Sequence, residues 1–289
     1  MPDDERPRRA PLGTGDGADG LRPTLLTADG PGGPAWPVGY GGAMNLLSRR
    51  RVSCLVLACA FGAGTLVTST ALGGSVSAAT RTLSSVLTTA KAAMARQSGV
   101  HFVINVTQGS PSQTENVVGD WGKTSGDETI TRGKEVMQLR VTPSDAYLSG
   151  NSSGLTEIFG LTAPQAGKLG KRWMSFKSTT GEYTDLARTL EISSAVGVLP
   201  KAKGTKLSTK TVKGTRLYLL SWTIAATSSA PRLSFTLTMP VSGAMLPRVE
   251  KATTTTGGVE IITFSKWGEH LVVAAPPAGS TIDSSKITG

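Results

Sequence analysis

The feature that most constrains the fold of this chain is a strict alternation of apolar and polar residues over short segments. The clearest case is Arg232–Met239, where Leu, Phe or Met stands at every odd position from 233 and Ser or Thr at every even one. Successive side chains of a β-strand point to opposite faces, so this pattern predicts a strand with one buried and one exposed face. The many Thr residues also favour strands over helices.

Similar segments recur along most of the chain. We expect strands at residues 101–107, 116–121, 128–131, 135–141, 146–151, 171–176, 206–213, 217–226, 232–239, 246–254, 259–267 and 271–275. Consecutive strands joined by short turns usually pair with each other, which predicts an antiparallel meander. Apolar residues at helical spacing predict one helix over 81–97 and another over 183–199, broken near Ser193, and the stretch between 151 and 171 is helix-capable. The predicted fold class is α+β.

The N-terminal part of the chain divides into two segments of different character. Residues 1–43 are rich in Pro, Gly and Asp and lack apolar periodicity, which predicts a disordered extension. In residues 44–78, three arginines precede a run of apolar or small residues, and Val76–Ala78 supplies small residues for cleavage. This arrangement is typical of a secretory signal peptide. We hypothesise that translation begins at Met44 and that the preceding residues are an over-extended gene prediction.

Two other interpretations of residues 44–78 stay open. The apolar run reaches the roughly 20 residues that a membrane anchor needs, although Gly, Ser and Thr dilute it. Val56–Cys59 is an imperfect lipobox, which would place a lipid anchor on Cys59. Under each interpretation, residues 79–289 form a single domain that is secreted or held in the cell envelope, on the outer face of the cytoplasmic membrane.

Composition excludes several kinds of site from this exported part. The only cysteines, Cys54 and Cys59, lie in the apolar segment, so no thiol nucleophile, thiolate metal site or disulfide is available after it. His101 and His270 are the only histidines, and a histidine metal site or a catalytic triad would need one of them. The neighbour Glu269 would point to the opposite strand face from His270. We expect no metal site and no cofactor.

One formal catalytic motif occurs. Gly150–Gly154 matches G-x-S-x-G around Ser152, and Asp185 and His270 follow in the order that an α/β-hydrolase requires. A nucleophile elbow also needs a parallel sheet, which the predicted meander does not supply. We therefore interpret the motif as a turn and expect no catalytic residues. A hydrolase remains a third, minor hypothesis, which would need Ser152 beside His270 or a polar cluster around His101.

The segment 201–216 carries a charge run in a chain of net charge +10. Its six cations, with no acid among them, are Lys201, Lys203, Lys206, Lys210, Lys213 and Arg216. They predict either contact with an anionic membrane surface or cell-wall polymer, at about 1 kcal/mol per basic residue near a charged membrane, or a solvated hairpin that keeps the protein soluble. Few aromatic residues are interleaved for base stacking, so nucleic acid is not an expected partner.

The order of the predicted helices and strands resembles that of a known protein family. A helix directly after the signal leads into the strand at 101–107, a strand that reads Ala146–Asn151, a helical stretch and the strand start Gly170–Trp173. Another helix, several long strands and a closing Ala275–Gly279 follow. In this order the chain resembles the LolA/LolB-like lipoprotein-carrier superfamily, in particular its actinobacterial LppX/LprG-type branch, over most of residues 79–289.

The resemblance implies a strongly curved antiparallel sheet, a half-barrel, with helices covering its concave face and an apolar pocket for acyl chains between them. The strand at 217–224 is apolar on both faces, which suits a strand between a core and a cavity or one packed on both sides. We expect the pocket to be lined by Leu217, Leu219, Trp222, Ile224, Leu233, Phe235 and Leu237. The LppX/LprG branch is normally anchored through a lipobox cysteine, and the poor match at Cys59 leaves membrane tethering open.

Two main hypotheses of function follow. The first is an exported, non-enzymatic, monomeric binder or carrier of lipids or lipidated molecules in the bacterial cell envelope. It requires a cavity of roughly 300 Å³ or more. The alternative is an envelope module of the same fold with a filled pocket, which binds another protein or a cell-wall polymer through its surface.

Overall fold

A computed structural model describes residues 81–288, apart from residues 109, 228 and 229. The predicted extension at 1–43, the signal peptide or anchor at 44–78 and the candidate lipidation residue Cys59 lie outside the described residues. Their interpretation therefore stays a prediction, as does the assignment of residues 79–289 to one domain.

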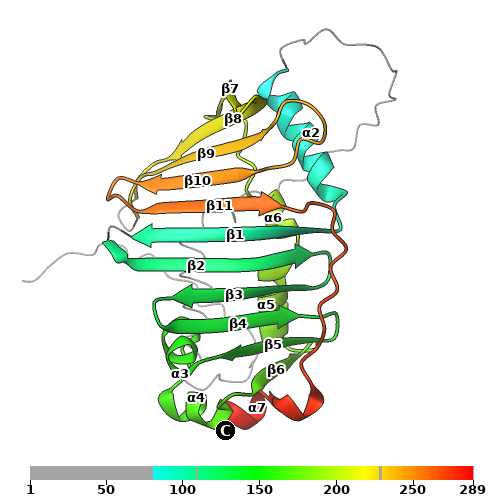
Figure 1. Ribbon diagram of the computed structural model, residues 1–289, viewed down its shortest axis with the longest axis vertical. Helices are drawn as coiled ribbons and strands as arrows, with labels where there is room; N and C mark the ends of the chain where they lie inside the picture. The colour runs from blue at the N-terminus through cyan, green and yellow to red at the C-terminus, as the bar shows by residue number, and fades with distance from the viewer. Residues whose placement is uncertain (1–80, 109, 228–229, 289) are drawn as a thin grey trace, which may run out of the picture. The chain divides into compact units, whose positions relative to one another are not determined.

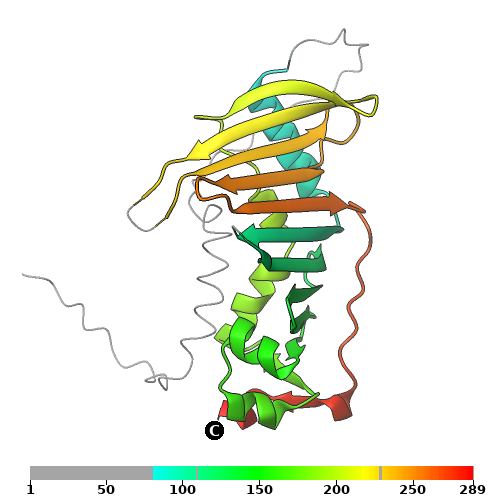
Figure 2. The same cartoon turned by 60° about the vertical axis from the view of Figure 1, so that its left-hand side comes forward.

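The described chain forms one open, curved sheet of twelve strands with helices on one face (Figures 1 and 2). The strands are β1 Gly99–Gln108, β2 Ser110–Gly122, β3 Gly126–Arg132, β4 Glu135–Val141, β5 Asp145–Gly150, β6 Trp173–Lys177, β7 Lys206–Val212, β8 Thr215–Ile224, β9 Leu233–Pro240, β10 Val249–Thr254, β11 Val259–Ser265 and β12 Thr281–Asp283. The predicted α+β class with helices over a curved sheet is confirmed.

The strand order is β12-β6-β5-β4-β3-β2-β1-β11-β10-β9-β8-β7. The chain therefore makes one antiparallel meander from β1 to β6 and a second from β7 to β11, and the first strand of one pairs with the last strand of the other. In Figure 1 the β1–β6 meander forms the lower half of the sheet and the β7–β11 meander the upper half. Among the described strands, only β12 and β6 pair in parallel.

The described helices are α2 Leu83–Ala95, α3 Ser152–Gly154, the π-helical η1 Leu155–Phe159, α4 Ala163–Leu169, α5 Gly181–Leu190, α6 Ser193–Val196, the 3₁₀ turn η2 Ala278–Ser280 and α7 Ser285–Thr288. Four of them, α2, α3, α4 and α5, begin at a residue whose side chain caps them. The Thr82 and Thr180 hydroxyls accept hydrogen bonds from the first turns of α2 and α5, and Thr162 with Gln165 forms a capping box on α4. The predicted helices at 81–97 and 183–199 are confirmed, the second with its break.

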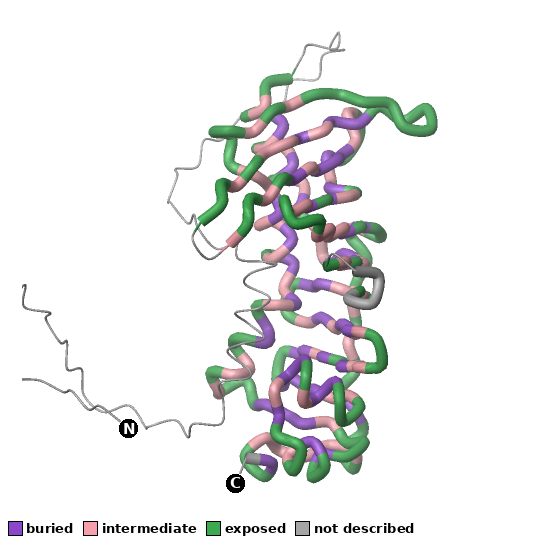
Figure 3. The backbone as a smooth tube through the Cα atoms, turned by 90° about the vertical axis from the view of Figure 1, so that its left-hand side faces the viewer, coloured by how far each residue is buried: buried purple, intermediate pink, exposed green. Residues whose placement is uncertain are grey.

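The buried side chains form two hydrophobic clusters on the helix-facing side of the sheet. Figure 3 marks along the backbone which residues are buried. In the large cluster, residues of the lower strands and of β11 pack against residues of η1, α4, α5 and α6. The small cluster joins Val86 and Ala90 of α2 to the upper strands through Leu220, Leu237 and Met239. The lower half is thus covered by several short helices, whereas the upper half is covered mainly by one.

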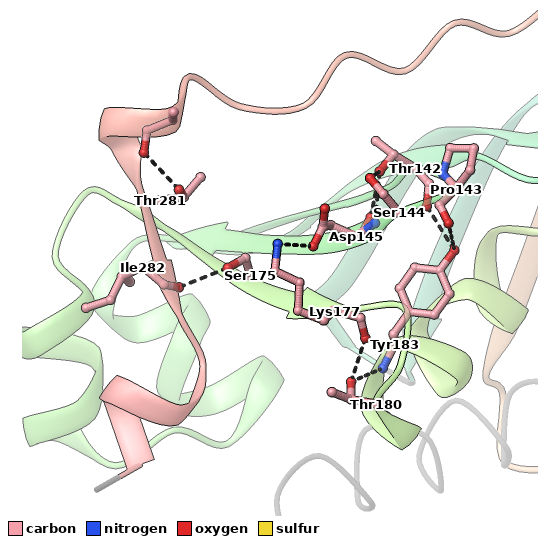
Figure 4. A network of polar contacts seen from close by, with 11 residues as sticks. Thr142, Pro143, Ser144, Asp145, Ser175, Lys177, Thr180, Tyr183, Thr281 and Ile282 are labelled. Carbon is pink, nitrogen blue, oxygen red and sulfur yellow. Dashed lines mark hydrogen bonds and ion pairs between the residues drawn. The ribbon is translucent and has the colours of Figure 1, made fainter.

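Polar contacts fasten the helical cover of the lower half (Figure 4). The Tyr183 hydroxyl of α5 donates a hydrogen bond to the Thr142 carbonyl over 2.9 Å, and the Lys177 ammonium lies 2.8 Å from Asp145. Burial alone would raise the pKa of Asp145, but the hydrogen bond and charge of Lys177 outweigh it, so the pKa of Asp145 is lowered. These contacts link β4, β5, β6 and α5.

Two sequence predictions about strands were wrong. Residues 271–275, predicted as a strand, run as a coil, while the unpredicted strand β12 pairs in parallel with β6. Alternating apolar residues suited a strand at 271–275, but Val272 is 78% exposed and the segment pairs with no strand among the described residues. Within the part of the chain that the structure describes, no helix combines the length and apolar character needed to cross a membrane.

Candidate functional site

The helix-facing surface of the upper half is the candidate site, because two rows of side chains cross it from β8 to β1. In the first row, Trp222 pairs with Phe235, Phe235 with Ala252, and Ala252 with Glu260. In the second row, Leu237 pairs with Glu250, and Glu250 with Ile262. Directly paired residues of antiparallel strands share a face. We call the set Trp222, Phe235, Glu250, Ala252, Glu260 and Ile262 the seam surface.

The seam surface lies between the two hydrophobic clusters. Leu237 belongs to the small cluster under α2, and Ile262 belongs to the large cluster. Glu250 stands between these two residues on the intervening strand. A carboxyl group therefore separates residues of the two clusters on β10, the strand next to the β11–β1 junction of the two meanders, in a row that is otherwise apolar.

Glu250 is buried without adequate polar compensation. The residue is 4% exposed, and its Oε2 atom finds no hydrogen-bond partner among the described residues. Burial, and secondarily the charge of Glu260, raise the pKa of Glu250 to about 8. The group is therefore mostly an uncharged carboxylic acid at neutral pH, able both to donate and to accept a hydrogen bond.

Glu260 lies diagonally across the β10–β11 pair from Glu250. Burial, and then the charge of Glu115, raise the pKa of Glu260 to about 7. Glu115 follows in the same row, because Glu260 pairs with Val106 of β1 and Val106 pairs with Glu115 of β2. The nearest cation along that row is Arg132, which forms an ion pair with Glu135. Acidic groups thus dominate this part of the helix-facing surface.

Aromatic stacking gives the seam surface a rigid apolar side. The rings of Trp222 and Phe235 stack with centroids 5.0 Å apart and planes 7° apart. Phe235 is buried and Trp222 half-buried, with Trp222 packed against the small cluster. A flat aromatic wall beside a carboxyl group can hold an apolar chain and a polar head group together.

The structure brings five of the seven predicted pocket residues together on the helix-facing side of β8 and β9: Trp222, Ile224, Leu233, Phe235 and Leu237. Leu217 and Leu219 point to the opposite face, because they alternate with Tyr218 and Leu220 of the small cluster. These two leucines therefore cannot line the same pocket as the other five. The sequence could not reveal this division, since β8 is apolar on both faces.

The surface of the described residues has depressions outside the predicted pocket, of which two are informative. One, of about 300 Å³, lies beside α5 and is lined by residues that include Val141, Tyr183 and Leu190. The other, of about 430 Å³, lies at the ends of β9, β10 and β11 and is lined by residues that include Leu246, Phe264 and Trp267. The predicted pocket residues line neither of them, so the cavity expected between sheet and helices stays a prediction.

The six cations of segment 201–216 are all exposed but do not share one face. Lys206 and Lys210 lie on the outer face of β7, and Arg216 lies on the helix-facing side of β8. Lys213 occupies the turn between these strands with φ 48°, next to Gly214 with φ 75°, as a tight hairpin turn requires. Lys201 and Lys203 precede β7. Because β7 is an edge strand, its lysines also discourage pairing with other chains.

The residues of the hydrolase hypothesis lie apart. Ser152 is the first residue of α3, which the Asn151 side chain caps. The helix directly follows β5, whose last residue, Gly150, pairs with Met137. His270 follows β11 beside the opposite strand ends, next to Glu269, whose carbonyl lies close to Gly99. The remaining histidine, His101, contacts Asp120 at 2.9 Å, a cross-strand partner that its sequence separation did not suggest. Among the described residues, no group of three or more His, Cys, Asp or Glu side chains could hold a metal ion.

The described residues thus form an α+β fold with an open, curved sheet and helices over one face. No protein-family model matches the sequence, and no curated protein matches it. Solved structures do match: lipoprotein LppX of Mycobacterium tuberculosis has 18% identity and a TM-score of 0.42, over 67% of this chain and 100% of that one. LprF of Mycobacterium bovis has 15% identity and a TM-score of 0.41, over 66% and 95% of the two chains.

A third match, MucB, has 12% identity and a TM-score of 0.30, over 68% of this chain and 60% of that one. LppX and LprF are proteins of the type that the sequence resembles, and the likeness to them is one of structure. Since each TM-score lies below 0.5, the ligand of this chain has to be argued from its own residues.

Proposed function

We propose that this protein is a non-enzymatic binder or carrier of lipids or lipidated molecules, exported to the bacterial cell envelope, which holds acyl chains against the helix-facing surface of its upper half. One observation carries the proposal. The surface of β8 and β9 continues apolar from the small cluster through Trp222 and Phe235 to Ile224 and Leu233, and Trp222, Ile224 and Leu233 are only half-buried. Partly exposed apolar side chains on an otherwise internal face favour an apolar ligand.

The cover of this surface also supports the proposal. The lower half is packed beneath several short helices, but the upper half relies mainly on α2, whose Val86 and Ala90 contact the sheet. The C-terminal end of α2 contributes the fully buried Met94 to the large cluster, so only the N-terminal part of the helix is independent of it. That part can shift with less loss of buried area than an interlocked set of helices can. An acyl chain could then enter beside α2 without unfolding the large cluster.

The proposal is tested by two substitutions on one strand. Trp222 and Leu219 are both half-buried on β8 but face opposite sides of the sheet. We expect Trp222→Asp to abolish uptake of a fluorescent long-chain acyl probe, whereas Leu219→Asp retains it. Circular dichroism and thermal unfolding of each variant would show that the fold is kept. Equal uptake by the two variants, or no uptake by the unmodified protein, would refute an acyl-binding face on this side.

The alternative function, an envelope module that binds a protein or a cell-wall polymer, is favoured by one observation. The two clusters are tightly filled, with residues such as Phe102, Leu148 and Leu237 fully buried, and the basic hairpin β7–β8 is exposed. If this function holds, Lys206→Glu with Lys210→Glu should abolish binding to anionic cell-wall polymer at low salt. Retained binding by that double variant would argue against the hairpin as the contact.

A further inference from the structure

The packing of the upper half gives no reason for a carboxyl group at the position of Glu250. Its register places it on the helix-facing surface between Leu237 and Ile262, both apolar and buried. A buried carboxyl group without a hydrogen-bond partner destabilises a protein, and native structures rarely leave one unsatisfied. Its Oε2 atom finds no partner among the described residues, although the side chain is 4% exposed. This cost is understandable if a ligand supplies the partner.

The surroundings of Glu250 restrict what that partner can be. Glu260 lies diagonally beside it on β11, and Glu115 lies further along the row that contains Glu260. The cation nearest in that row, Arg132, is paired with Glu135. Arg248 shares the face of Glu250 two residues earlier but is exposed. A ligand group with a negative charge beside Glu250 would therefore meet the carboxyl groups first, so an anionic head is disfavoured. The uncharged acid can also donate to an acceptor, but its carbonyl oxygen, and both oxygens once it ionises, can only accept. A head group that donates a hydrogen bond and carries no negative charge is therefore complementary to this site.

The aromatic wall lies in the neighbouring row. Phe235 stacks on Trp222 and pairs with Ala252, which pairs in turn with Glu260. The small Ala252 side chain therefore stands between the aromatic pair and the Glu260 carboxyl group. A ligand whose alkyl chain contacts the aromatic rings would bring its first polar group within reach of the two glutamates.

We propose that the seam surface is a head-group subsite in which Glu250, supported by Glu260, hydrogen-bonds the donor group of a lipid that carries no negative charge. The inference rests on the proposed lipid-binding function and adds the class of lipid. Alcohols and amines with a long alkyl chain share the required chemistry, whereas fatty acids and anionic phospholipids lack it. The carboxyl groups thus contribute selectivity and the apolar rows contribute affinity.

A matched series of single-chain probes tests this subsite on the full chain at pH 7. Oleyl alcohol, oleylamine, methyl oleate and oleate share one alkyl chain and differ in the head group. We expect at least one of the two donors, alcohol or amine, to bind about tenfold or more tightly than methyl oleate, and oleate to bind least, in competition with a fluorescent acyl probe. Equal affinity for all four heads would overturn the subsite and leave the acyl-binding function standing, whereas no binding of any probe would overturn both.

Two variants assign the selectivity to Glu250. In Glu250→Leu the preference for a donor over methyl oleate should disappear, while Glu157→Leu, a control at an exposed glutamate, should keep it. Glu250→Gln retains a hydrogen-bond acceptor but cannot ionise to pair with a protonated amine, so it should keep a preference for the alcohol and lose one for the amine. The preference that survives in this variant therefore distinguishes the two donors. A preference unchanged in both Glu250 variants would overturn the proposal.

Discussion

The two halves of the sheet have the same strand architecture but different interiors. In the lower half, the large cluster is interlocked with η1, α4, α5 and α6, and hydrogen bonds such as that of Tyr183 fasten α5 to the sheet. In the upper half, α2 covers a small cluster, and the buried Glu250 and half-buried Glu260 interrupt the apolar rows. The packing of the lower half favours stability, whereas the upper half contains features that reduce it. Such features are common where a protein binds its ligand.

The largest effects should come from truncating the two clusters. Leu148 and Leu237 are both fully buried, in the large and the small cluster respectively. We expect Leu148→Ala to lower the free energy of unfolding by about 3–5 kcal/mol, and Leu237→Ala by about 2–3 kcal/mol, because a site under a single helix collapses more easily around a cavity. Chemical denaturation of both variants measures the difference. A larger loss for Leu237→Ala would contradict the contrast between the halves.

A second prediction concerns the pH dependence of stability. The folded-state pKa of Glu250 is raised from 4.5 to about 8, so the unfolded carboxyl group ionises first as pH rises. Its contribution is therefore most favourable below about pH 4.5 and is lost as pH approaches 8. Relative to the unmodified protein, Glu250→Gln should gain up to a few kcal/mol between these limits, since one pKa unit is worth about 1.4 kcal/mol.

Unfolding at pH 5 and pH 8 measures this gain. Glu157→Gln provides the control, because that glutamate is exposed. If Glu250→Gln shows the same pH dependence as the unmodified protein, the carboxyl group is not buried in an apolar environment in solution.

A third prediction compares two half-buried tryptophans. Trp222 stacks on Phe235 on the helix-facing side, whereas Trp173, on β6 of the lower half, contacts the guanidinium of Arg140 at 4.8 Å from its ring. Removing an aromatic pair costs about 0.5–1.5 kcal/mol beyond the lost area, and the cation–π contact at a partly exposed site about 0.5–1 kcal/mol. Trp222→Ala and Trp173→Ala should therefore have similar stabilities, while only Trp222→Ala weakens acyl-probe uptake. Weaker uptake in both would mean that the effect is not local to the upper half.

The smallest effect should come from the Lys177–Asp145 ion pair. Lys177 is 61% exposed, so Lys177→Ala should lower the free energy of unfolding by no more than about 1 kcal/mol. The pKa of Asp145 is lowered, so the contribution is present above pH 3.8, the ordinary value, and is lost as pH falls further. Thermal unfolding at pH 7 and pH 3 would detect it, and a loss that persists at pH 3 would exclude the ion pair as its cause.

Much of the fold could be predicted from the sequence because the alternation is strong where one face is buried. Arg232–Met239 predicted β9 to within one residue at each end, and helical spacing predicted α2 and the broken pair α5–α6. Three-residue β12 carries no alternation long enough to detect, and its parallel partner β6 lies about a hundred residues earlier in the chain. Its formation depends on tertiary contacts that a local pattern does not contain.

The candidate site could be predicted only in part. Alternation placed Leu233, Phe235 and Leu237 on one face, but it could not choose between the two apolar faces of β8. Glu250 and Glu260 were missed because a glutamate in a strand ordinarily marks the exposed face. Only the register between β9, β10 and β11 shows that these carboxyl groups share a face with buried apolar residues.

The most direct test of acyl binding by this protein is native mass spectrometry of the protein as an actinobacterial host exports it, followed by organic extraction of bound species. We predict a bound lipid without negative charge, and its loss in the Trp222→Asp variant while Leu219→Asp retains it. If the measured mass is that of the protein without bound lipid, and added lipid is not taken up, a lipid-binding upper half would be contradicted. The exposed basic hairpin between Lys206 and Arg216 would then be the next surface to test.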